Sequence, residues 1–172
     1  MLRVNPGSGC SMFVSGKAGK QDESTINLNQ MSTVHWKSAD CYVNGDPTLH
    51  LQYANVQFPC TKITCTTPGD LKWIDMGLDV PPGAIITGII ICYQLSNSKS
   101  FISQVRLTEQ TTPNLRTVHH DDSTDLVSTA PVCATSKVNY GAAINGAVNL
   151  SLRLNFTSTN DTIMLGAVGV IY

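Results

Sequence analysis

Charged side chains are scarce in this chain. Asp, Glu, Lys and Arg make up 13% of its 172 residues, about half the usual share of a soluble domain. The formal net charge is −1, and the N-terminal region is too poor in Lys and Arg to form an arm that binds nucleic acid. We therefore expect no nucleic-acid partner.

The sequence also lacks a long apolar run. A membrane-spanning helix needs about 20 apolar residues, and the most apolar stretch, residues 80–94, ends well short of that. Residues 1–13 lack the apolar core of a secretory signal, because Pro6 and Gly7 interrupt them. We expect no membrane span, no signal peptide at this N-terminus, and a cytoplasmic or virion-associated location.

Helical periodicity is the third absence. No window combines a sustained 3.6-residue apolar repeat with capping residues, and only a short helix over residues 23–31 is considered. The polar residues are mostly Ser, Thr, Asn and Gln, which suit strands and turns better than exposed helices. This composition favours an all-β protein.

Alternation of apolar and polar residues is what the chain has instead. In residues 148–156, "VNLSLRLNF", every second residue is apolar and the others are polar. This pattern predicts a strand with one dry face and one wet face. Residues 74–80 alternate in the same way, and residues 49–58 do so with a phase shift that predicts a bulge near Ala54–Asn55.

Residues 80–94, "VPPGAIITGIIICYQ", predict a strand buried on both faces. Their β-branched residues favour extended backbone, and Pro81 and Pro82 precede the strand and cost it no ladder hydrogen bond. Burial on both faces means a central position, or a core on one side and a subunit contact on the other. In the final strand, Gly166, Ala167 and Gly169 let a bulky neighbour approach closely.

Together these segments predict an antiparallel β-sandwich of jelly-roll type. We divide the chain into an irregular N-terminal segment, residues 1–30, and a β-sandwich domain, residues 31–172. Trp73 borders an alternating segment and is predicted to lie in the core.

The six cysteines are predicted to be free thiols, since no signal peptide is visible. A disulfide or metal role is the alternative, although the only close spacing is Cys60-x4-Cys65. Cys92 lies inside the apolar run and is predicted to be a small core residue. The cysteines are Cys10, Cys41, Cys60, Cys65, Cys92 and Cys133.

Two parts of the sequence resemble known proteins. Residues 78–107 and the ending "GAVGVIY" resemble uncharacterised bacterial and phage-associated β-sandwich proteins, which carry an apolar strand after a Pro-Gly-Ala turn and end in a Gly-Val-x-x-Tyr strand. The C-terminal strand is also similar to the last strand of trimeric tumour-necrosis-factor-like jelly rolls. These resemblances imply a module that binds or assembles, and they supply no catalytic residue.

The one dense cluster of potential ligands is "VHHDDSTD", residues 118–125. His119, His120, Asp121 and Asp122, with Asp125 nearby, could bind a divalent metal. On a strand, however, each face receives only two of them, so His35 or His50 would have to complete the site. The alternative is a polar, solvated loop. No cofactor other than this metal is expected.

Aromatic residues make up only 6% of the chain, and most are expected in the core. Trp36 and Tyr42 are the predicted ligand-binding residues, because such rings can stack on sugars. Nucleophilic catalysis has no support, since the GxSxG elbow is absent and Cys133 has no accompanying motif.

The function predicted first is therefore a non-enzymatic structural or interaction module that forms a homo-oligomer, of which a trimer is one form. The alternatives are a module that binds carbohydrate or another ligand at a phage or cell surface, with a protein partner also open, and a metal-dependent jelly-roll enzyme.

Overall fold

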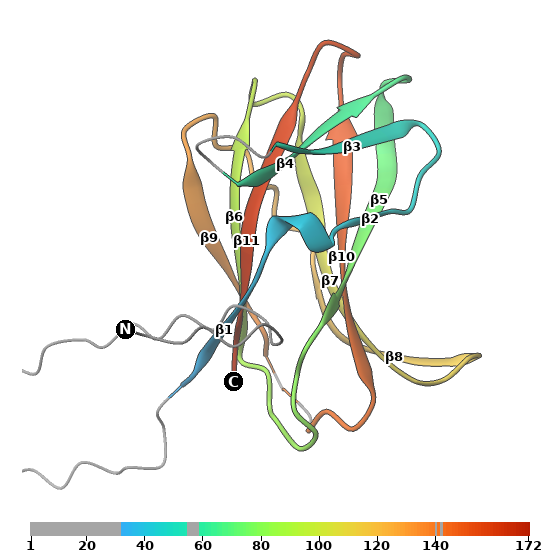
Figure 1. Cartoon of the computed structure of the whole chain (residues 1–172), viewed down its shortest axis with the longest axis vertical. Coiled ribbons are helices and arrows are strands. Elements are labelled where there is room, and N and C mark those ends of the chain that lie inside the picture. The colour runs from blue at the N-terminus through green and yellow to red at the C-terminus, as the bar shows by residue number, and fades with distance from the viewer. Residues whose placement is uncertain (1–31, 55–58, 140, 142) are drawn as a thin grey trace, which may run out of the picture.

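The computed structural model describes residues 32–54, 59–139, 141 and 143–172. These residues form two facing antiparallel sheets (Figure 1), as the alternation predicted. The predicted irregular segment 1–30, and with it the helix considered over residues 23–31, lies outside the described residues. Among the described residues, no helix is long and apolar enough to cross a membrane.

Sheet 1 has the order β3-β4-β11-β6-β9, and β1 also pairs with β11. Its strands are β1 (Val34–Lys37), β3 (Leu49–Ala54), β4 (Cys60–Cys65), β6 (Gly88–Leu95), β9 (Val132–Lys137) and β11 (Ile163–Ile171). Sheet 2 has the order β2-β5-β10-β7-β8. Its strands are β2 (Val43–Asn44), β5 (Gly69–Leu78), β7 (Phe101–Thr112), β8 (Leu115–Asp122) and β10 (Ala147–Phe156). A short 3-10 turn, η1 (Ala39–Cys41), joins β1 to β2.

The core lies between the sheets and is made by alternate residues of the long strands. On β10 the predicted dry face is confirmed, since Leu150, Leu152 and Leu154 are fully buried. On β5 the buried residues are Ile74 and Met76. The predicted bulge near Ala54–Asn55 falls at the limit of the description: β3 pairs with β4 in unbroken register up to Ala54, and residue 55 lies outside the described residues.

The apolar run of residues 80–94 forms a turn followed by β6. Gly83 has φ +84° and Ala84 N donates to Pro81 O (3.1 Å), which is a turn that needs glycine at its third position. β6 lies between β11 and β9, and its inward residues Ile89 and Ile91 are buried. Its outward residues, Ile90 among them, are half-buried, so both faces are shielded but only one is core.

The predicted close approach on β11 is also confirmed. A Cβ added at Gly169 would lie 3.1 Å from the Trp36 ring, and one added at Gly166 would lie 3.3 Å from the Cβ of Cys92. Glycine at these positions lets β1 and the outward side chains of β6 lie flat against β11.

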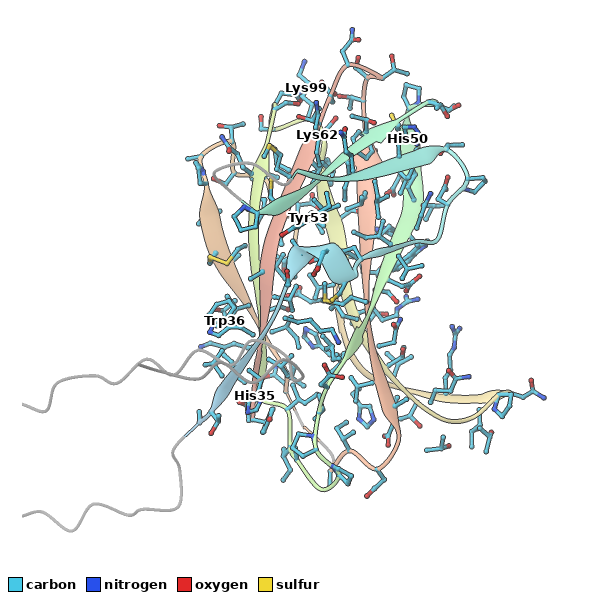
Figure 2. All side chains as sticks on the ribbon, viewed as in Figure 1. His35, Trp36, His50, Tyr53, Lys62 and Lys99 are labelled. Carbon is cyan, nitrogen blue, oxygen red and sulfur yellow. A yellow bond between two sulfur atoms is a disulfide. The ribbon has the colours of Figure 1, made fainter. Side chains whose placement is uncertain are left out.

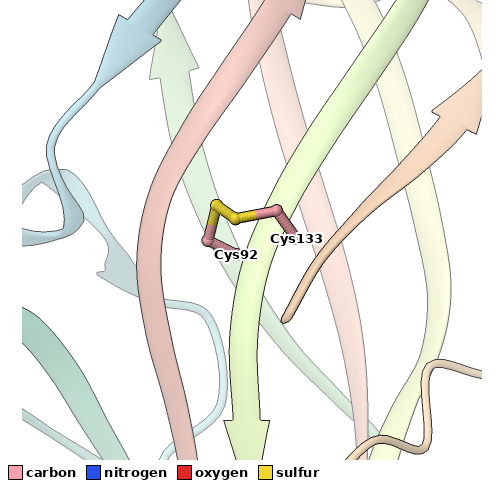
Figure 3. The surroundings of a disulfide bond; sticks show 2 residues. All are labelled: Cys92 and Cys133. Carbon is pink, nitrogen blue, oxygen red and sulfur yellow. A yellow bond between two sulfur atoms is a disulfide. The ribbon is translucent and has the colours of Figure 1, made fainter. Parts of the chain in front are cut away.

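The prediction of free thiols is wrong for two of the cysteines. Cys92 on β6 and Cys133 on β9 are directly opposite in the register and form a disulfide (Figure 3). Cys92 therefore points out of sheet 1 and is not a core residue. The partner was hidden because the residues are 41 positions apart, and only the strand register brings them together. Cys41, Cys60 and Cys65 are free, and Cys10 lies outside the described residues.

This disulfide gives a test of stability. Replacing Cys133 by Ser, or reducing the protein, should lower the free energy of unfolding by roughly 2–4 kcal/mol, because the bond closes a long loop in the unfolded chain. Urea unfolding with and without reductant measures the change. Cys41→Ser, which removes an exposed free thiol, is the matched control and should change stability by less than about 0.5 kcal/mol. A midpoint unaffected by reductant would contradict the bond.

Candidate functional site

The outer faces of the two sheets differ in chemistry. The outer face of sheet 1 carries an apolar hollow beside the disulfide, with Pro59, Val132 and Met164 among its lining residues. The outer face of sheet 2 carries a polar groove of about 720 Å³. The residues that line the groove are Trp73, Asp75, Gly77, Arg106, Thr108, Gln110, Pro113, Asn114, Leu115, Arg116, Ala147, Val148, Asn149 and Ser151.

Trp73 is the aromatic residue of this groove, and its predicted place in the core is wrong. Ile74 and Met76 point inward from β5, so Trp73 must point outward by the two-residue period of a strand. The residue is half-buried. The guanidinium carbon of Arg106 lies 5.0 Å from the centre of its ring, within the range of a cation–π contact.

A row of polar residues crosses the floor of the groove. The register places Asp75 of β5 opposite Ser151 of β10, Ser151 opposite Arg106 of β7, and Arg106 opposite Asp121 of β8. Ser151 Oγ donates to Asp75 Oδ1 (2.5 Å), and Asn149 Nδ2 donates to the same oxygen (3.0 Å). Arg106 Nη2 donates to Asp121 Oδ2 (3.1 Å). The row therefore places a carboxylate, a hydroxyl and a guanidinium side by side.

The groove stays open because of Gly77. This residue lies two positions after Asp75 on the same face, and a Cβ added there would meet no atom within 4 Å. The β7–β8 hairpin forms the far wall, since Pro113 to Arg116 at its tip line the groove. Figure 1 shows this hairpin extending away from the body of sheet 2. Leu115 there is 60% exposed.

The two aromatic residues predicted to bind a ligand occupy different settings. Trp36 lies on β1 at the outer side of sheet 1 (Figure 2), where it is half-buried over Gly169. Tyr42 packs against the core, and its buried hydroxyl has no partner among the described residues. Burial raises the pKa of Tyr42. The two rings therefore do not form one exposed platform, and neither lines the groove on sheet 2.

The four residues predicted to bind metal lie on β8, and each already has a protein partner. His119 Nε2 lies 2.7 Å from Glu109 Oε2, and both side chains are more than nine-tenths buried. Glu109 Oε1 also accepts hydrogen bonds from the backbone N–H groups of Asn145 and Gly146. These backbone bonds and the contact with His119 hold the pKa of Glu109 below its usual value.

His120 and Asp122 meet at a serine of β9. Ser136 Oγ donates to Asp122 Oδ2 (2.5 Å) and lies 2.7 Å from His120 Nε2. Because the serine gives its proton to the carboxylate, His120 Nε2 must be the donor to Ser136. Burial lowers the pKa of His120. The serine therefore joins two strand edges and is not an activated nucleophile, which would have to give its proton to the histidine.

Asp121 points to the other face, where Gln104 and Arg106 donate to it. No group of three or more His, Cys, Asp or Glu side chains in the described part of the chain could hold a metal ion. The divalent metal at His119, His120, Asp121 and Asp122 thus stays a prediction without a set of three ligands. Elemental analysis of the purified protein tests it, and absence of Zn, Fe, Mn, Ni and Ca would contradict it.

Comparison with known proteins identifies the fold. No protein-family model matches the sequence, and no curated protein matches it. Several solved β-sandwich modules are similar in structure. The CBM22-1–GH10 modules of xylanase 10B from Clostridium thermocellum, complexed with xylohexaose, match with a TM-score of 0.52 and 12% identity over 78% of this chain and 27% of that one.

Two further structures show the same arrangement. The CBM36-1 domain of a xylanase from the hindgut metagenome of Trinervitermes trinervoides matches with a TM-score of 0.51 and 11% identity, over 80% of this chain and 96% of that domain. A CBM29-2 mutant complexed with cellulohexaose matches with a TM-score of 0.50 and 10% identity, over 80% and 91%. The chain is thus an all-β jelly-roll sandwich. The resemblance to phage-associated and tumour-necrosis-factor-like proteins stays a prediction.

The polar residues of the groove were not predicted from the sequence. One signal was available: Trp73 and Asp75 alternate with the predicted apolar residues Ile74 and Met76, and this phase puts them on the wet face. Arg106, between the buried Val105 and Leu107, shares this phase, but its place beside Trp73 could not be predicted, because it depends on the register of three neighbouring strands.

The buried Glu109 pair predicts a dependence of stability on pH. Since the folded pKa of Glu109 is lowered, its contribution is fully present above the unfolded value of about 4.5 and is lost as pH falls through the folded value. Glu109→Gln should lower the free energy of unfolding at pH 7 by about 1–3 kcal/mol. Below the folded pKa the difference between the two proteins should shrink.

Urea unfolding at pH 7 and pH 3 measures this difference. Asp79→Asn is the control, because Asp79 pairs with Lys37 while its side chain is 92% exposed and such pairs contribute little. A Glu109→Gln effect of equal size at both pH values would show that the charge of Glu109 is not what stabilises the site.

Proposed function

We propose that this protein is a carbohydrate-binding module and that its ligand lies in the groove on the outer face of sheet 2. The observation that carries the proposal is the partly exposed Trp73 ring within a groove that polar and apolar residues line in about equal measure. A pyranose ring has C–H groups that pack on an indole face and hydroxyls that need donors and acceptors at its rim. The row of Asp75, Ser151 and Arg106 supplies both hydrogen-bond donors and hydrogen-bond acceptors.

The structural neighbours support the same class of function. Two of the similar structures contain xylohexaose and cellulohexaose. At this level of identity they establish the fold of the chain and leave its ligand open, since one fold hosts many functions. They therefore guide the choice of the first probes, and the groove itself supports the site.

Self-assembly into a homo-oligomer is the second candidate function. The observation that favours it is the apolar hollow on the outer face of sheet 1, about 570 Å³ in volume, with Pro131, Val132 and Met164 in its lining. Exposed apolar surface of this kind is typical of interaction sites. Light scattering of the purified protein tests this candidate, and a strict monomer at high concentration would contradict it.

The disulfide bears on where the protein works. Disulfides persist in oxidising environments and are rare in the cytoplasm, so the Cys92–Cys133 bond supports an extracellular or cell-surface location over a cytoplasmic one. Such a location is where a module that binds polysaccharide would meet its ligand.

Calorimetric titration with xylohexaose, cellulohexaose and a mannose-based oligosaccharide tests the carbohydrate proposal. Trp73→Ala should weaken binding about thirtyfold or more, the effect of losing a central aromatic contact. Gly77→Leu should also weaken it, because the added side chain enters the open floor of the groove, where no atom stands in its way.

Trp36→Ala is the matched control, since it removes the other tryptophan, which lies on sheet 1. The affinity of Trp36→Ala for these oligosaccharides should equal that of the unmodified protein. Loss of binding in Trp36→Ala together with full binding in Trp73→Ala would move the site to Trp36, one of the two residues predicted from the sequence. Absence of binding to every glycan on a broad array would overturn the proposal.

A further inference from the structure

Arg106 has an unusual environment for an arginine on the outer face of a sheet. Its Nε atom is buried and has no hydrogen-bond partner among the described residues. The nearby Trp73 ring, 5.0 Å from the guanidinium carbon, is the large side chain that can cover it. The guanidinium therefore stacks over one face of the indole and leaves the other face of the ring free of this contact.

The guanidinium is also held from its far side. Arg106 Nη2 donates to Asp121 Oδ2 (3.1 Å), and the other oxygen of Asp121 accepts from Gln104 Nε2. Gln104 is buried, so the carboxylate is fixed by a rigid donor as well as by Arg106. A chain of contacts thus runs from Gln104 through Asp121 and Arg106 to Trp73.

The remaining arginine near Trp73 is differently placed. Arg153 is its cross-strand neighbour on β10. Its Nε donates to Ser103 Oγ (2.8 Å) and lies 3.5 Å from Asp70 Oδ1. Arg153 therefore has its own partners on the same sheet face, and the cation–π contact belongs to Arg106.

We propose that Arg106 is a positioning residue, which holds the Trp73 ring by stacking on one of its faces and leaves the other face to the ligand. The step from ring position to sugar binding rests on the proposed function. Because Arg106 covers one face of the indole, only the other face is free, and a single sugar ring can stack on it. The favoured ligand is a pyranose with equatorial hydroxyls, whose C–H groups gather on its faces, with Asp75 and Ser151 accepting or donating at its edge.

The first experiment needs no ligand. In a Trp36→Phe background Trp73 is the sole tryptophan, so its emission and its quenching by acrylamide report the ring alone. Arg106→Ala should shift the emission and raise the quenching constant about twofold, because the covered face becomes accessible. Arg106→Lys should restore part of the protection, since it keeps a cation without the planar fork. Arg153→Ala is the matched control and should leave quenching near the unmodified value.

The second experiment measures binding of cellulohexaose and xylohexaose to the same variants. Arg106→Ala should weaken binding about tenfold, within the range expected for loss of a cation–π contact, and should have no further effect in a Trp73→Ala background, where no ring is left to position. Circular dichroism and thermal melting establish that the variants are folded. If Arg106→Ala does not fold, the binding of Arg106→Lys is measured in its place.

The outcomes separate the two proposals. If quenching responds to Arg106 but no glycan binds, Arg106 positions Trp73 and the carbohydrate function is wrong. If glycans bind and Arg106→Ala changes neither quenching nor affinity, the positioning role is overturned and the function stands. Equal losses from Arg106→Ala with and without the intact Trp73 ring would also overturn it, because they would show that Arg106 acts on the ligand directly.

Discussion

The alternation of apolar and polar residues along β10 determines which side chains lie on each face of sheet 2. This strand lies between β5 and β7, so its register fixes which residues of all three strands share a side. Leu150, Leu152 and Leu154 enter the core, and the residues between them reach the outer face. A slip of one residue would exchange the two sets. The apolar core therefore holds the polar row of the groove in place.

The sequence was informative wherever a property depends on neighbours along the chain. The strand at residues 148–156 and the close approach at Gly169 were both predicted and are confirmed. It was uninformative wherever distant strands meet. Asp75 and Ser151 are 76 residues apart, and their contact follows from the register of the folded sheet. The Cys92–Cys133 bond was missed for the same reason.

Trp73 is the instructive error among these predictions. Its place beside an alternating apolar segment suggested the core, but its phase relative to Ile74 and Met76 placed it outside. The phase of a residue on a strand reflects the backbone geometry of the whole element, whereas apolar neighbours alone do not fix the face on which a side chain lies. An aromatic residue on the polar phase of an otherwise regular strand is therefore worth considering as a functional residue.

The disulfide restrains an edge strand of the sandwich. β9 and β8 each end a sheet, and an unpaired strand edge invites pairing with another chain and aggregation. The Cys92–Cys133 bond ties β9 covalently to β6, and Ser136 of β9 contacts His120 and Asp122 of β8. Peeling of β9, a first step toward edge-to-edge polymerisation, is thus opposed by a covalent clasp, and the hydrogen bonds of Ser136 extend part of that restraint to β8.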